Sequence, residues 1–133
     1  MKKSSSPKRK PAHSRAGAKQ IARVRKLCLS LPGSAEKLSH GEPTFFANKK
    51  VFVMFANNHH HDGHVAVWLP VAEGARDELV RDDPQKFYVP PYVGVKGWMG
   101  IELSAVSDDE LGFYVCEAHR LVIAKKPSTL RTV

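Results

Sequence analysis

The sequence lacks the patterns that mark the commonest enzyme and membrane classes. It contains no GxSxG, no Walker loop, no HExxH and no GxGxxG that follows a strand and opens a helix. No apolar run approaches the roughly 20 residues of a transmembrane helix, and the N-terminus has no apolar signal segment. The sequence has no CxxC, so Cys28 and Cys116 are expected to be buried, reduced thiols on apolar helix faces. We therefore predict a cytoplasmic, non-enzymatic protein without cofactor or metal and without a membrane partner.

Acidic residues are missing from the start of the chain. Residues 1–26 contain ten basic side chains and no acidic one, whereas the rest of the chain contains eleven basic and thirteen acidic residues. The net charge of +8 therefore belongs to the N-terminal segment, and such a segment commonly meets nucleic acid, although a solubilising tail has the same composition. The candidate phosphate contacts in this segment are Lys2, Lys3, Lys8, Arg9, Lys10, Arg15, Lys19 and Arg23.

Large aliphatic residues are also scarce at the N-terminus. Residues 1–17, here called the N-terminal arm, contain two prolines and a run of serines, with no aliphatic side chain larger than alanine apart from Met1. Burial cannot offset the ordering entropy of such a segment, so the arm is predicted to be disordered. We predict a single domain over residues 18–127 and a frayed C-terminus over 128–133.

Apolar periodicity within residues 18–127 predicts an α+β fold. Helical spacing is clear up to Leu31 and from Leu111 onward, where Ser107–Glu110 forms a capping box. The order predicts a two-layer sandwich, helix–three strands–helix–two strands–helix, around a single antiparallel sheet of about five strands. The expected strands are Glu36–His40, a segment ending at Phe46, Val51–Ala56, His64–Pro70, Tyr88–Val93 and Gly97–Leu103, with a helix at Ala72–Asp82.

Four of the seven histidines lie within Asn57–His64, between the two strongest strand candidates. A zinc site normally draws three or four ligands from more than one structural element, and consecutive histidines point in different directions. We therefore predict a polar hairpin tip on which His59, His60 and His61 are exposed and bind no specific metal.

Several short motifs occur in a characteristic order between Ile21 and Pro127. With them the chain resembles the MmcQ/YjbR-like family, which implies the same sandwich in a CyaY-like, secretion-chaperone-like fold. The resemblance also implies DNA binding through wing-like hairpins, and it brings no catalytic residues. The chain departs from the family in its basic arm and its histidine-rich insert. The motifs are Leu31-Pro32-Gly33, Gly41 with Pro43 and Phe45, Pro91-Tyr92-Val93-Gly94, Gly97-Trp98 with Gly100, and Ala118–Leu121 with Lys125.

Two kinds of partner remain open. As a wing, the turn that contains Lys49 and Lys50 would contact DNA phosphates with little sequence preference, and Lys96 would add a further contact. Alternatively, aromatic residues among prolines and glycines would line a groove for a protein or small-molecule ligand, unless Trp98 packs in the core. The candidate groove residues are Pro43, Tyr88, Tyr92 and Trp98.

Overall fold

The computed structural model describes residues 15–128, which form three α-helices, six strands and three short 3-10 segments. The helix α1 begins at Arg15, inside the predicted arm, so residues 1–14 of the arm and the tail after Ser128 lie outside the described residues. In chain order the elements are α1 (Arg15–Leu29), β2 (Ser34–Ser39), β3 (Glu42–Ala47), β4 (Lys50–Asn57), η3 (His59–His61), β5 (Val65–Leu69), α2 (Ala75–Asp82), β6 (Phe87–Tyr88), η4 (Val93–Lys96), β7 (Met99–Glu102), η5 (Leu103–Ala105) and α3 (Asp108–Ser128).

The six strands form one antiparallel sheet in the order β2-β3-β4-β5-β7-β6. The predicted α+β class and single antiparallel sheet are confirmed, and β4 pairs with β5 as expected, with Phe55 opposite Val67. The sheet has six strands rather than about five, and four of them precede α2. The additional strand therefore belongs to the group before α2, where β2, β3, β4 and β5 stand in place of the predicted three. The expected strand Tyr88–Val93 is reduced to β6, whose two residues pair with β7 at the sheet edge, because the prolines that follow lack the N–H that a strand ladder uses.

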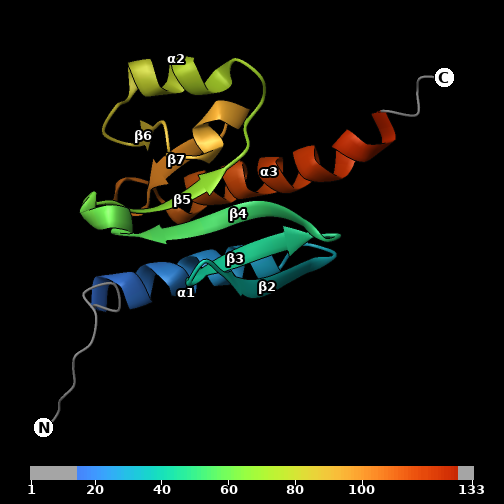
Figure 1. The fold of residues 1–133 in the computed structure, drawn as a ribbon, viewed down its shortest axis with the longest axis horizontal. Helices are drawn as coiled ribbons and strands as arrows, with labels where there is room; N and C mark the ends of the chain where they lie inside the picture. The colour runs from blue at the N-terminus through green and yellow to red at the C-terminus, as the bar shows by residue number, and fades with distance from the viewer. Residues whose placement is uncertain (1–14, 129–133) are drawn as a thin grey trace, which may run out of the picture.

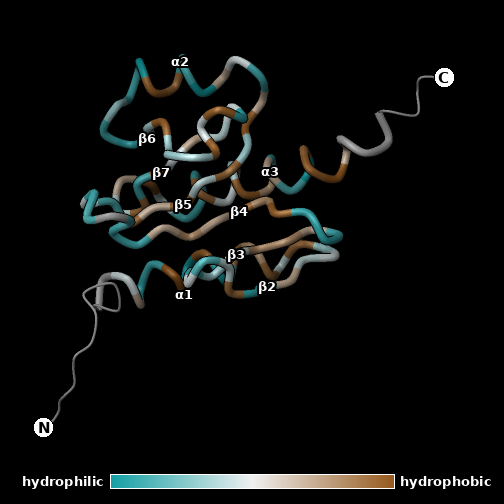
Figure 2. Tube along the Cα trace, viewed as in Figure 1, coloured by the Kyte–Doolittle hydropathy of each residue, from teal (hydrophilic) through white to brown (hydrophobic). Residues whose placement is uncertain are grey.

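The helices α1 and α3 cover one face of the sheet, and α2 lies beside the β6 edge (Figure 1). The central strands are largely hydrophobic, whereas α2 and the β4–β5 connection, which lie at the periphery, are largely hydrophilic (Figure 2). No helix within residues 15–128 combines the length and apolar character that a membrane span requires. The covered face buries Val24 and Cys28 of α1, Leu111, Val115, Ala118 and Val122 of α3, and Phe45, Phe52, Phe55, Val67, Leu69, Phe87, Met99 and Ile101 of the sheet.

The start of α3 follows the predicted cap in part. Ser107 Oγ accepts a hydrogen bond from the Glu110 backbone N–H at 3.1 Å, which satisfies one orphan donor of the first turn. The Glu110 carboxylate does not complete the box, because it accepts hydrogen bonds from Lys86 Nζ at 3.0 and 3.2 Å. A long-range ion pair to the segment before β6 therefore replaces half of the local motif.

Arg23 joins α1 to the segment that leads into α3. Its guanidinium donates to the backbone carbonyls of Leu103 at 2.7 Å and Val106 at 2.9 Å, and to the Asp108 carboxylate at 2.7 Å. The side chain is only 19% exposed, so these carbonyls have little access to water as a substitute donor. Arg23 therefore contributes to the fold itself.

Replacing Arg23 with methionine keeps an apolar stem and removes the guanidinium. We expect R23M to lower the free energy of unfolding by about 2 kcal/mol, because two carbonyls lose a charged donor. Urea unfolding followed by far-UV circular dichroism measures this change. The matched control is Lys19→Met, an exposed position one turn earlier, which should change stability by less than about 0.5 kcal/mol. Equal unfolding midpoints for the two variants would contradict the structural role of Arg23.

Candidate functional site

The face of the sheet opposite α1 and α3 contains a pocket of about 530 Å³, here called the open-face pocket. Thr44 pairs with Met54 and Met54 pairs with Trp68, so the three side chains share one face, while their neighbours Phe45, Phe55 and Val67 belong to the core. The volume lies within the range of small-molecule sites. The lining residues are Ser39, His40, Glu42, Thr44, Met54, Phe55, Ala56, His59, Trp68, Tyr92 and Val93.

Aromatic side chains cover the other half of this face, over β5, β7 and β6. Trp68 Nε1 donates a hydrogen bond of 2.8 Å to the Tyr88 hydroxyl, and the His64 ring stacks on Tyr88 with 4.0 Å between centroids and 10° between planes. Gly100 lies opposite both Trp68 and Tyr88, and a Cβ at this position would come within 2.5 Å of the Tyr88 ring. The glycine therefore allows the Tyr88 ring to lie directly on β7.

His59 extends this layer to the pocket. Its ring centroid lies 5.3 Å from that of Trp68 and 5.6 Å from that of Tyr92, with both pairs nearly perpendicular. The edge-to-face arrangement is a favourable geometry for such rings. We refer to His59, His64, Trp68, Tyr88 and Tyr92 together as the aromatic layer.

The prediction that His59 is exposed at a hairpin tip is wrong. Asn58 adopts a left-handed conformation with φ of 57°, and its Oδ1 accepts a hydrogen bond of 2.9 Å from the Gly63 backbone N–H. This closed loop contains the 3-10 turn η3, which directs half-buried His59 against Trp68, while His61 is exposed as predicted. The side chain of His60 lies outside the described part of the structure. Within residues 15–128, no three histidine, cysteine, aspartate or glutamate residues form a group that could hold a metal ion.

Carboxylates surround the aromatic layer. The Glu102 carboxylate accepts a hydrogen bond from His64 Nδ1. Burial raises the pKa of the Tyr88 phenol, and the nearby negative charges of Asp62 and Glu102 act in the same direction. Among the described residues that line the open-face pocket, Glu42 is acidic and none is lysine or arginine. The pocket lining therefore contains one carboxylate and no lysine or arginine, while the nearby Lys37, the cross-strand partner of Thr44, holds its Nζ over the Phe46 ring.

The four predicted groove residues do not meet in one pocket. Tyr92 lines the open-face pocket, and Tyr88 lies beside it in the aromatic layer. Trp98 is half-buried outside the pocket lining, and its carbonyl accepts a hydrogen bond of 3.3 Å from Arg76. The tryptophan that forms the pocket wall is Trp68, for which the sequence pattern predicts only a place in a strand.

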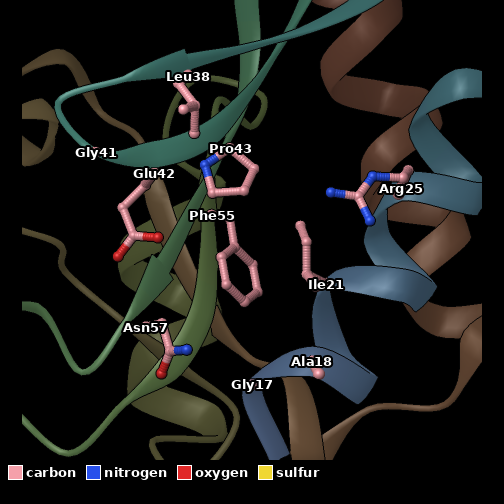
Figure 3. Close-up of a pocket in the computed structure, with 10 residues that line it drawn as sticks. All are labelled: Gly17, Ala18, Ile21, Arg25, Leu38, Gly41, Glu42, Pro43, Phe55 and Asn57. Atoms are coloured by element: carbon pink, nitrogen blue, oxygen red, sulfur yellow. The ribbon is translucent and has the colours of Figure 1, made fainter. Parts of the chain in front are cut away.

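Pro43 lies on the other side of the sheet, at a second pocket of about 300 Å³. Figure 3 shows Ile21 and Arg25 of α1 facing Pro43 and Phe55 across this space. Arg25 donates to both carboxylate oxygens of Glu36 at 2.7 and 2.8 Å, which lowers the pKa of the Glu36 carboxyl. The pocket lies between the start of α1 and the β2–β3 hairpin, and the ion pair between Arg25 and Glu36 joins α1 to β2 beside it.

The predicted phosphate-binding residues are placed unevenly. Lys19, Lys49, Lys50 and Lys96 are exposed, whereas Arg23 is held by the fold. Arg15 opens α1, and its side chain is outside the described part of the structure. The remaining candidates, Lys2, Lys3, Lys8, Arg9 and Lys10, lie outside the described residues.

The two cysteines differ in environment. Cys28 is buried, and burial raises the pKa of its thiol, which makes it a packing residue. Cys116 is exposed, contrary to the sequence prediction, because the neighbouring Val115 and Ala118 direct the apolar side of α3 to the sheet.

Replacing Gly100 with alanine should displace the Tyr88 ring, because the new methyl group overlaps it. We expect G100A to lower the free energy of unfolding by about 1–3 kcal/mol and to shift the fluorescence of Trp68, whose indole loses its hydroxyl partner. The matched control is Gly112→Ala in α3, where the Cβ would meet Leu27 Cδ2 at an ordinary 3.6 Å and helix propensity favours alanine. Equal stability and equal emission for the two variants would contradict this role of Gly100.

Comparisons with known proteins agree with this architecture. The family model described as YjbR matches residues 29–121. The crystal structure of a Deinococcus radiodurans protein with a domain described as DUF419 superposes with a TM-score of 0.64 at 20% sequence identity, over 77% of each chain. At this identity the likeness shows the fold alone, and a comparison with curated proteins gives no match. Because the family match runs from the end of α1 into α3 and covers most of the sequence, the chain belongs to the YjbR family.

Proposed function

We propose that this YjbR-family protein is a non-enzymatic nucleic-acid-binding protein whose basic N-terminal arm supplies most of the affinity. The observation that carries this proposal is the charge distribution, with ten basic and no acidic side chains in residues 1–26. A segment of this kind neutralises phosphates without reading bases. DNA bound in this way would show strong salt dependence and weak sequence preference.

Exposed lysines at one end of the folded part support a secondary contact. Asn48 and Lys49 have φ of 50° and 75°, as in the two-residue type I′ turn of a tight hairpin. The Asn48 N–H donates to the Gly33 carbonyl at 3.2 Å, so this turn lies beside the end of α1. Among the described residues no ion pair engages Lys49 or Lys50, so both are suited to phosphate contact.

The assignment as a non-enzyme rests on how the reactive side chains are used. Cys28 is buried as a packing residue. His119 Nε2 donates to the Pro32 carbonyl at 2.7 Å, and its ring packs edge-on against Phe52. His64 is occupied by Glu102 and Tyr88. These three side chains support the fold, and the exposed hydrogen bond of 3.1 Å between Ser39 Oγ and His40 Nδ1 joins two adjacent residues at the end of β2.

The basic arm is tested by removing its charge at constant length. The variant replaces the five basic residues before α1 with glutamine, at Lys2, Lys3, Lys8, Arg9 and Lys10. Each phosphate contact contributes about −0.9 to the slope of log affinity against log salt, so losing three to five contacts should flatten the slope by about 3 to 4.5. Fluorescence anisotropy with a labelled duplex at several salt concentrations measures the slope.

Two further variants locate the contacts. Replacing Lys49 and Lys50 with glutamine should flatten the slope by at most about 1.8, because it removes at most two contacts. Arg81→Gln is the control, since Arg81 lies on α2 between the carboxylates of Glu78 and Asp82. Slopes that match the parent protein in the five-residue variant would show that the arm does not bind DNA.

A further inference from the structure

The open-face pocket is built differently from the surface that would meet phosphates. Its floor consists of small or flexible side chains, Thr44, Ala56 and Met54, while Trp68 and Tyr92 provide aromatic walls. Thr44 and Ala56 are buried, with relative exposures of 1% and 2%, although α1 and α3 lie on the opposite face of the sheet. The pocket is therefore a formed hollow in the sheet surface, and its walls come from distant segments.

The backbone at Tyr92 is strained. Tyr92 has φ of 62° and ψ of −67°, and the Val93 N–H donates to the Pro91 carbonyl at 2.6 Å. These values describe the rare γ-turn with positive φ at its central residue, which is unfavourable for a bulky side chain. Strained residues of this kind concentrate at ligand-binding positions. Here the strained turn carries an aromatic ring that is 64% exposed at the pocket wall.

The charged residues in and beside the pocket favour a cationic ligand over an anionic one. The lining contains the Glu42 carboxylate, and Asp62 and Glu102 act on the adjoining Tyr88. No lysine or arginine occurs among the described lining residues, so a phosphate or carboxylate would be desolvated without a counter-charge. A cation would be favoured by the carboxylate and by the faces of tryptophan and tyrosine rings.

We propose that the open-face pocket binds a small organic ammonium ion with an apolar, ring-sized body. The apolar body would lie on Met54 and Ala56 against Trp68, and the ammonium group would lie between Tyr92 and Glu42. This site is separate from the proposed nucleic-acid contacts, because its described lining contains a carboxylate and no lysine or arginine that could contact a phosphate.

Three isosteric probes test the sign of the charge. They are 2-phenylethylamine, 2-phenylethanol and phenylacetate, which are cationic, neutral and anionic at pH 8, where an ordinary imidazole is uncharged. In a Trp98→Phe background Trp68 is the remaining tryptophan, so its fluorescence reports binding. We expect the amine to bind about tenfold more tightly than phenylacetate, with the alcohol between them. Equal or tighter binding of phenylacetate, or no saturable signal with any probe, would overturn the proposal.

Four substitutions locate the site. Glu42→Gln should remove most of the preference for the amine over the alcohol, and Ala56→Leu should fill the floor and abolish binding of all probes. Tyr92→Ala changes an exposed side chain, so it should leave the fold intact and weaken the amine about tenfold. The matched control is Val95→Ala on the same loop, where the side chain is 94% exposed and no effect is expected. Equal effects of Y92A and V95A would contradict the assignment.

Two measurements distinguish a ligand site from a self-association surface and from the DNA-binding arm. Sedimentation velocity would detect a dimer formed through this face. If the parent protein forms a dimer that Tyr92→Ala dissociates, and the parent protein binds no amine, the face is a self-association surface and not a ligand site. Duplex-DNA affinity should be unchanged in Ala56→Leu and in the presence of the amine. A protein that binds DNA but no amine would refute this site alone, whereas the reverse result would refute the basic arm alone.

Discussion

Two long helices can cover only one face of a six-stranded sheet, and the rest of the structure follows from this limit. Both faces carry apolar residues, because Trp68, Met54 and Ala56 lie opposite the core side chains. Leaving such residues in water is unfavourable by roughly 25 cal/mol per Å² of apolar surface. The chain buries part of this area with its own aromatic side chains, and the part that stays uncovered forms the open-face pocket.

The aromatic layer that covers part of the open face depends on the glycine at position 100. Gly100 has no side chain, so Tyr88 lies across β7 and its hydroxyl reaches the indole of Trp68. Trp68 in turn supports His59, which packs against Tyr92 at the pocket wall. The pocket shape is therefore fixed by a series of contacts between β6, β5, η3 and the loop before η4, which are far apart in the sequence.

The charges divide the protein into regions suited to different partners. Positive charge is concentrated in residues 1–26, while Glu42 lines the open-face pocket and the adjoining Tyr88 lies near Asp62 and Glu102. Arg23 and Arg25 belong to the basic segment in sequence, yet both make contacts within the fold. Arg23 donates a hydrogen bond to the Leu103 carbonyl, and Arg25 forms an ion pair with Glu36. A count of basic residues therefore overstates the number available to a polyanion.

The sequence alone determined the class of fold, because alternation and helical spacing are local properties that survive in any context. It placed β4 beside β5, and it identified Ser107 as the cap of α3. The tertiary structure decided which side chains meet. Trp68 and Trp98 both lie in or beside predicted strands, and only the register of β5 with β7 places Trp68 opposite Gly100 and makes it the pocket wall. Likewise, His59 turns inward because Asn58 reverses the chain beside a ring from another strand. Local patterns assign a residue to a face of the sheet, but its neighbours on that face come from distant segments whose register no local pattern contains.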